Sequence, residues 1–161
     1  MNDSSAIIEM VRLGGVYYHI CGTTAEGVFK DAVSRIALPE GVDSTTLIAG
    51  LTERERLMST SIGSGVALPH PRVPLITDTG SERIYVCYLD RGVNFDAMDG
   101  VPIHVMFLIL STGSTNHLNI LSRLSYVLQK PLFREALRGK PDTEELIELI
   151  KKHFQGEKEN E

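Results

Sequence analysis

Two segments of the sequence are apolar at almost every position, and they constrain the fold more than any other feature. They are RIYVCYLD at residues 83–90 and IHVMFLIL at residues 103–110. A strand that faces water on one side alternates apolar and polar residues, whereas a strand covered on both sides is apolar throughout. We therefore expect both segments to lie in the centre of a sheet that helices cover on both faces.

Helical patterns surround these two segments. A capping box formed by Thr23 and Glu26 precedes apolar residues at helical spacing. A later helix is expected to begin at Pro131 and to stop at Gly139, and the last one to be capped by Asp142. The expected helices cover residues 24–36, 43–57, 115–129, 131–138 and 143–154, and a short strand is expected at 66–68. The helix at 115–129 should bury Leu118, Ile120, Leu121, Leu124 and Leu128.

The length of 161 residues suits one domain with a core of its own. We expect an α/β fold: a single domain whose mixed, mostly parallel central sheet is covered by helices on both faces. The domain should span residues 5–154. Residues 155–161, QGEKENE, have nothing to bury and should form a disordered polar tail.

Composition and spacing exclude several classes of function. A net charge of −5 argues against a nucleic-acid partner, and no apolar run is long enough for membrane insertion. Cys21 and Cys87 lie far apart, so we expect a cytoplasmic protein with Cys87 packed in the core. The histidines lack metal-binding spacing, and no nucleotide-binding glycine motif occurs, so neither a metal nor a cofactor is expected.

His70 is the first residue with a pattern that suggests chemistry. It lies between Pro69 and Pro71, which restrict the backbone on both sides of it. Gly63 and Gly65 precede it and would allow close approach of a backbone or a ligand. A neutral imidazole is a competent nucleophile. From the residues alone, His70 is either such a nucleophile or a surface histidine in a proline-rich turn.

Three other side chains could belong to a reactive site with His70 or could have a purely structural role. Arg54 falls on the same helical stripe as Leu47 and Leu51, where it either extends along apolar surface or reaches an anion. His117 lies in the first turn of an expected helix, where it either caps the turn or helps to bind an anion. His104 lies within an apolar strand and is expected to be a satisfied core histidine.

The string STSIGSGVALPH, residues 59–70, makes a more specific comparison possible. ERERL precedes it, HLNILSRLSYVL begins 47 residues after its histidine, and NFDAMDGVPIHVMFLIL lies between. Together these segments resemble the enzyme IIA domain of the fructose/mannitol/nitrogen-regulatory class in the bacterial phosphotransferase system. The resemblance covers roughly residues 5–153.

The resemblance implies a phosphotransferase component that works through a covalent phosphohistidine. His70 would accept phosphate from a histidine phosphocarrier protein, with His117 and Arg54 as active-site partners. Ser59 and Thr60 match the hydroxyl positions before Gly63 and Gly65, and these four residues would form the phosphate-binding part. No metal or cofactor is implied.

The resemblance leaves the downstream role open. The chain is expected to be a nitrogen-regulatory type of component that signals to a partner protein; the alternative is a fructose- or mannitol-specific IIA that passes phosphate to a separate IIB domain. A third possibility is a protein-binding regulator with a vestigial site. Pro71 suggests it, because the family usually has a small residue there and proline removes a backbone N–H.

Overall fold

The computed structural model describes residues 3–155 of the chain. Within them, five strands form one mixed sheet in the order β1-β4-β5-β3-β2. The strands are β1 Val16–Ile20, β2 Ser61–Gly63, β3 Val66–Ala67, β4 Arg83–Val93 and β5 Ile103–Leu110. β1 pairs with β4 and β3 with β5 in parallel, whereas β4/β5 and β2/β3 are antiparallel. The two apolar segments are thus adjacent inner strands, as expected.

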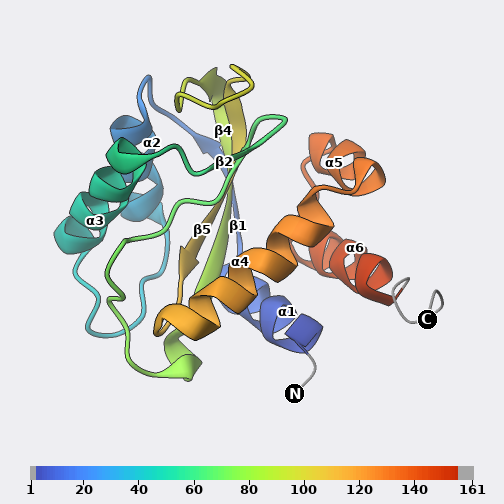
Figure 1. Cartoon of the computed structure of the whole chain (residues 1–161), viewed down its shortest axis with the longest axis horizontal. Helices are drawn as coiled ribbons and strands as arrows, with labels where there is room; N and C mark the ends of the chain where they lie inside the picture. The colour runs from blue at the N-terminus through green and yellow to red at the C-terminus, as the bar shows by residue number, and fades with distance from the viewer. Residues whose placement is uncertain (1–2, 156–161) are drawn as a thin grey trace.

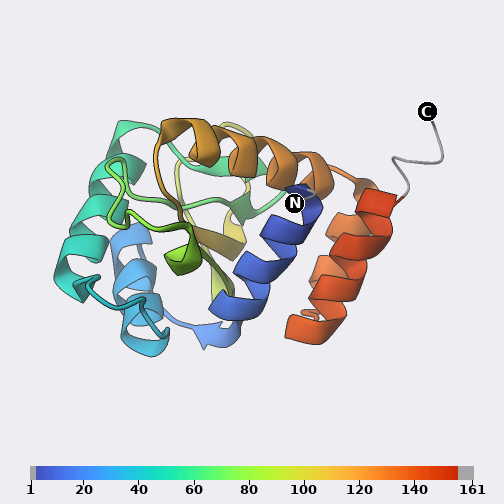
Figure 2. The ribbon, with the colours of Figure 1, turned by 90° about the horizontal axis from the view of Figure 1, so that it is seen from below.

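Helices cover both faces of this sheet (Figures 1 and 2). Two of them, α2 and α3, lie on one face, and α1, α4, α5 and α6 lie on the other. The helices are α1 Asp3–Gly14, α2 Ala25–Arg35, α3 Ser44–Leu57, α4 Ser114–Leu128, α5 Pro131–Arg138 and α6 Thr143–Gln155, with a 3₁₀ turn at Thr79–Ser81. The expected single α/β domain with a doubly covered mixed sheet is confirmed.

Alternate residues of the inner strands supply two separate cores. Val86 and Phe107 face α1 and the C-terminal helices, while Cys87 and Met106 face α2 and α3. All four are completely buried, which explains why neither strand carries a polar face. The prediction that Cys87 packs in the core is confirmed.

Polar caps fix where several helices begin. The Asp43 carboxylate accepts a hydrogen bond from Thr46 N at 2.9 Å, and Asp142 accepts one from Glu145 N at 2.9 Å. The predicted Asp142 cap and the predicted start of the earlier helix at residue 43 are therefore confirmed. The capping box at Thr23 is wrong by one residue, because the hydroxyl of Thr24 accepts the bond from Gly27 N instead. Glu26 instead pairs with Lys30 one turn along α2 and with Arg56 on α3.

Other expectations about the elements need correction. Leu118 is 64% exposed although it was expected to be buried; Val127 takes a core position on α4 that the sequence pattern did not assign. The sequence pattern also did not identify α1, β1 and β2. The expected disordered tail lies outside the described residues except for Gln155, which ends α6. No helix in the described part of the chain is long and apolar enough to cross a membrane.

Candidate functional site

The chain carries His70 to one edge of the sheet immediately after β3. Leu68 N donates to Thr60 O at 3.0 Å, and Ile109 N donates to Pro69 O at 2.9 Å. These bonds continue the pairing with the neighbouring strands up to Pro69. His70 is therefore the first residue beyond a fixed strand end, between two prolines that limit its backbone.

The ring of His70 has one nitrogen engaged and one available. Its Nδ1 lies 2.8 Å from the carbonyl oxygen of Leu68. A carbonyl only accepts, so Nδ1 carries the proton and donates it. In the neutral ring the other nitrogen, Nε2, then holds the free lone pair. The fold thus selects the tautomer whose Nε2 is nucleophilic.

His117 is brought to His70 by the turn between β5 and α4. Ser111 directly follows β5, and its Oγ lies 2.6 Å from Nδ1 of His117 in the first turn of α4. The two imidazole rings are 4.5 Å apart between centroids and are inclined by 52°. Residues 47 positions apart in the sequence therefore form one half-buried pair.

Arg54 lies in the last turn of α3, on the same side of the sheet edge. It is half-buried, whereas Leu47 and Leu51 on the same stripe are fully buried. Its Nη1 donates to Met58 O at 2.6 Å, which holds the guanidinium at the end of the helix. Its charge lowers the pKa of both His70 and His117. Arg54 therefore acts electrostatically on both members of the histidine pair.

Both histidines are held neutral. Burial lowers the pKa of His70, with a smaller contribution from Arg54, although the bond to Leu68 opposes the change. Burial also lowers the pKa of His117, and together with His70 and Arg54 it brings the value to about 4. At neutral pH neither ring is protonated on both nitrogens, so the Nε2 lone pair of His70 is not blocked by a proton.

Ser59 and Thr60 directly precede β2, and Thr60 is hydrogen-bonded to Leu68, two residues before His70. The carboxylate of Glu55 accepts from Thr60 N at 3.1 and 3.2 Å, and Ser59 Oγ accepts from Ser61 N at 3.2 Å. Burial raises the pKa of Glu55. Thr60 Oγ1 is buried and has no hydrogen-bond partner in the described residues. The hydroxyl of Thr60 and the carboxylate of Glu55 nevertheless lie close together near this strand end.

The two glycines are not brought to His70. Gly63 and Gly65 form the tip of the β2–β3 hairpin, with φ values of 93° and 80° that favour glycine. A Cβ on Gly65 would lie 2.3 Å from Nδ1 of His104, at the opposite end of β3 from His70. The structure therefore gives these glycines a turn, not a place in the His70 site. His104 is half-buried and its ring has no hydrogen bond within the described residues, so it is not the satisfied core histidine that was expected.

Glu82 is a residue of this region that the sequence pattern did not identify. It is only 7% exposed, and its carboxylate accepts from Thr112 N at 3.0 Å and from Asn116 Nδ2 at 2.6 Å. It therefore ties the start of β4 to the first turn of α4, which carries His117. Nothing in the local sequence distinguishes Glu82 from a surface glutamate, because its partners lie 30 and 34 residues away.

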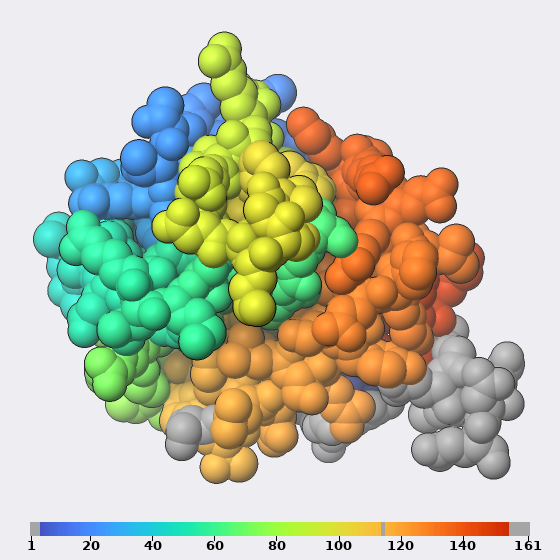
Figure 3. All heavy atoms as spheres, turned by 45° about the horizontal axis from the view of Figure 1, so that its top comes forward, coloured from blue at the N-terminus to red at the C-terminus, as the bar shows by residue number. Residues whose placement is uncertain are grey.

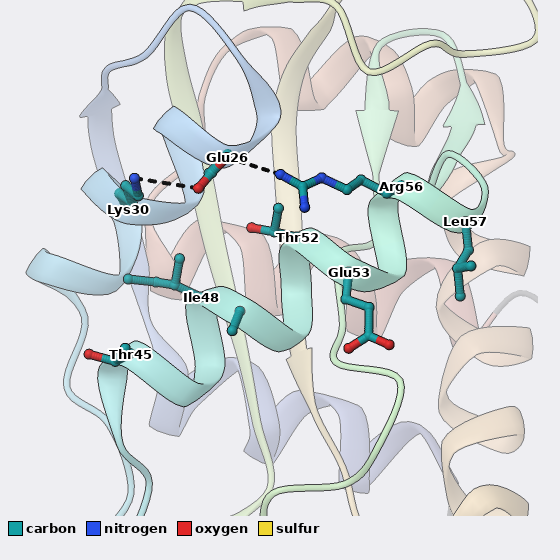
Figure 4. A pocket seen from close by; sticks show the side chains of 9 residues that line it. Glu26, Lys30, Thr45, Ile48, Thr52, Glu53, Arg56 and Leu57 are labelled. Atoms are coloured by element: carbon teal, nitrogen blue, oxygen red, sulfur yellow. Dashed lines mark hydrogen bonds and ion pairs between the residues drawn. The ribbon is translucent and has the colours of Figure 1, made fainter.

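Two other features lie apart from this site. A groove between α2 and α3 is lined on its rim by Glu26, which pairs with Lys30 at 3.4 Å and with Arg56 at 3.5 Å (Figure 4). Its lining does not include His70, His117 or Arg54. No group of three His, Cys, Asp or Glu side chains suited to a metal ion occurs among residues 3–155.

Comparison with known proteins gives one consistent result. Residues 16–153 match the family model described as phosphoenolpyruvate-dependent sugar phosphotransferase system, EIIA 2. A nitrogen regulatory protein from Pseudomonas aeruginosa is 32% identical over 88% of this chain and 92% of its own. A fructose-specific EIIABC component from Bacillus subtilis is 32% identical over 64% of this chain and 16% of its own. The crystal structure of nitrogen regulatory protein IIA-Ntr from Neisseria meningitidis superimposes with a TM-score of 0.77 and 26% identity, covering 89% of this chain and 98% of that one.

Proposed function

The chain belongs to the EIIA 2 family of the phosphoenolpyruvate-dependent sugar phosphotransferase system, and from this premise we propose that it carries a phosphoryl group on Nε2 of His70. The single observation that supports this most is the bond from Nδ1 of His70 to the Leu68 carbonyl. It fixes the tautomer in which Nε2 is free to attack. The ring of His117 lies 4.5 Å away between centroids, and the transferred phosphoryl group would lie beside it.

The reaction exchanges one nitrogen–phosphorus bond for another. The donor is a histidine phosphocarrier protein, whose N–P bond breaks as the bond from phosphorus to Nε2 of His70 forms. The donor imidazole keeps the electron pair of the broken bond and leaves as a neutral ring when its other nitrogen is protonated. The product ring at His70 is positive while Nδ1 keeps its proton, and the Leu68 carbonyl stabilises that charge.

Arg54 and His117 would stabilise the group in transfer. Phosphoryl transfer passes through a loose transition state, so the protein mainly supplies alignment and positive potential around the equatorial oxygens. Arg54 supplies a permanent charge that both imidazoles experience. His117 can donate from Nε2 when Ser111 donates to its Nδ1. Ser59 and Thr60 are the hydroxyl groups next to this strand end.

Labelling with phosphoenolpyruvate, enzyme I and a histidine phosphocarrier tests the proposal. We expect the wild-type protein to take up one acid-labile phosphoryl group and His70→Ala to take up none. A matched control is His19→Asn, because His19 is an exposed histidine with a positive φ that asparagine tolerates. This variant should label normally. Full labelling of His70→Ala would refute the assignment.

For the downstream role, we propose a regulatory component that signals to a partner protein in the cytoplasm. The P. aeruginosa relative, a nitrogen regulatory protein, aligns over nearly its whole length with this chain. The sugar-specific alternative, transfer to a separate IIB domain, is supported by the shorter match to the fructose-specific EIIABC component. Transfer of label from the phosphorylated chain to an isolated fructose IIB domain would favour the alternative.

The alternative of a protein-binding regulator with a vestigial site depends on Pro71, which packs against α3. A Cβ on Gly50 would lie 3.1 Å from Cβ of Pro71, so the proline is in close contact with the helix that carries Arg54. Packing against α3 therefore explains why a proline is found at position 71, independently of the backbone N–H that the proline removes. Absence of labelling in the wild-type protein, with partner binding retained, would establish the non-catalytic reading.

A further inference from the structure

A second polar cavity lies beside α5, away from His70. It has a volume of about 360 Å³ and is lined by the tip of the β2–β3 hairpin, the start of β5 and one side of α5. The hairpin tip points toward α5 in Figure 1, and the two elements are also adjacent in Figure 3. We propose that this cavity binds a small phosphate-bearing anion through Arg134, Arg138 and His104. The proposal does not depend on phosphoryl transfer at His70.

The two arginines give the cavity its charge. Arg134 and Arg138 are four residues apart on α5, so they lie on the same side of the helix. Nε of Arg134 donates to Leu128 O at 2.8 Å, which fixes the guanidinium and leaves its terminal nitrogens available. Neither arginine has an ion pair within 4 Å in the described residues. Backbone hydrogen bonds to its carboxylate lower the pKa of Asp99 beside the hairpin tip, and the charge of Arg134 has a smaller effect in the same direction. Glu135 is the one carboxylate in the lining, and it is exposed.

His104 contributes a half-buried ring to the same cavity. The ring packs directly against Gly65, where an added Cβ would lie 2.3 Å from Nδ1, so only glycine fits there. Burial lowers the pKa of His104, and Arg138 and Lys140 lower it further. Two positive side chains therefore act on this ring although the protein as a whole has a net charge of −5.

Ser64 completes the lining at the hairpin tip. Its backbone N donates to Oδ2 of Asp99 at 2.8 Å, which holds the tip, and its side-chain hydroxyl has no bond within the described residues. Two guanidinium groups, an imidazole and a hydroxyl approach from three elements. A phosphate group has three oxygens for such convergent donors, whereas a carboxylate has two in one plane. The small volume favours a small molecule.

This cavity and the His70 site lie at opposite ends of one short strand. β3 pairs in parallel with β5, so Gly65 lies beside His104 at the start of β5, while Pro69 lies beside Ile109 near its end. No residue lines both this cavity and the small cavity beside His117. A ligand at α5 can therefore be distinguished from a phosphoryl group at His70 by residue-resolved measurements.

Amide chemical-shift titration of the ¹⁵N-labelled full chain tests the proposal. The probes are inorganic phosphate, glycerol 3-phosphate and citrate, each at constant ionic strength set with sodium chloride. We expect the phosphate compounds to shift the amides of Ser64, Gly65 and His104 in a saturable way. Tighter binding of glycerol 3-phosphate would identify an organic phosphate as the ligand, and equal binding would identify inorganic phosphate.

Arg138→Gln is the informative variant, because Arg138 is exposed and its loss should not affect folding. Losing one charge-assisted hydrogen-bonding group should weaken binding roughly 10-fold. Arg12→Gln is the control; it removes the same charge from an exposed position on α1 and should leave binding unchanged. Shifts confined to the His70 region, equal binding by Arg138→Gln and wild type, or saturable binding of citrate alone would each overturn the proposal.

Discussion

At the residue scale, His70 and His117 have the same chemistry in the sequence but different neighbours in the fold. Nδ1 of His70 faces a carbonyl, which only accepts, and this fixes its tautomer. Nδ1 of His117 faces the hydroxyl of Ser111, which can donate or accept, so its tautomer can change. The pair therefore combines one imidazole whose tautomer is fixed with another whose tautomer can change, a difference that no spacing rule could have predicted.

Arg54→Gln tests the electrostatic link within this pair. Removing a positive charge makes protonation of a nearby imidazole easier, so the pKa of His70 and that of His117 should both rise, the latter from about 4. Titration of the ring ¹H or ¹⁵N signals measures both values. Arg12→Gln, an equal change of charge on α1, should leave them unchanged. If both values stayed the same in Arg54→Gln, Arg54 would not act on the site.

The same pKa direction gives a dependence of stability on pH. A histidine whose pKa is lowered by folding binds fewer protons in the folded state than in the unfolded state. The contribution of His117 to stability is therefore complete above its unfolded pKa of about 6.5. It is lost as the pH falls from there toward the folded value of about 4.

At the element scale, the sequence was most informative where one pattern determined one element. β5 and α5 have the expected bounds, because an apolar run and a proline-to-glycine interval define them without outside help. α1, β1 and β2 were not identified. β2 has only three residues, and its pairing with β3 depends on the hairpin rather than on its own composition. The sequence pattern also could not show that Gly63 and Gly65 form the hairpin tip, because a turn glycine and a ligand-binding glycine look alike in sequence.

Glu82→Gln tests how the start of α4 is held. The glutamine amide keeps the size of the side chain but has no negative charge. The carboxylate of Glu82 accepts hydrogen bonds from Thr112 N and Asn116 Nδ2 near the positive end of the helix. We expect a loss of about 1 kcal/mol in the free energy of unfolding. We also expect slower labelling of His70, because His117 lies in the same turn. Chemical denaturation and labelling rates measure the two effects.

A glutamate on α6 provides the control for this change. Glu144 is exposed and lies in the first turn of α6, so Glu144→Gln also removes a favourable charge near a helix N-terminus. It should alter stability slightly and leave the labelling rate unchanged. Equal labelling rates for Glu82→Gln and the wild-type protein would show that Glu82 stabilises α4 without positioning His117.

At the scale of the whole molecule, one short hairpin connects the His70 site with the cavity beside α5. The β2–β3 hairpin carries Ser64 and Gly65 at its tip, beside α5, and leads into His70 four residues after Val66. Its residues Val66 and Ala67 also enter the two opposite cores. The doubly covered sheet was predictable because apolar composition reports burial. That His70, His117 and Arg54 come together was predicted from the resemblance to a family and not from the residue patterns, because contacts between distant residues leave no local pattern.

Gly65→Ala tests whether this hairpin glycine serves the fold or a ligand at His70. An alanine there needs a left-handed backbone, and its Cβ would lie 2.3 Å from Nδ1 of His104 and 3.0 Å from Pro102 O. The sum of backbone strain and overpacking predicts a loss of about 3 kcal/mol in the free energy of unfolding. Gly41→Ala is the matched control, because Gly41 has a similar φ of 85° but no atom within 4 Å of the added Cβ; it should lose about 1 kcal/mol. If Gly65 instead bound phosphate at the His70 site, the Gly65→Ala protein would keep its stability but would no longer be labelled. That result would show that Gly65 belongs to the His70 site.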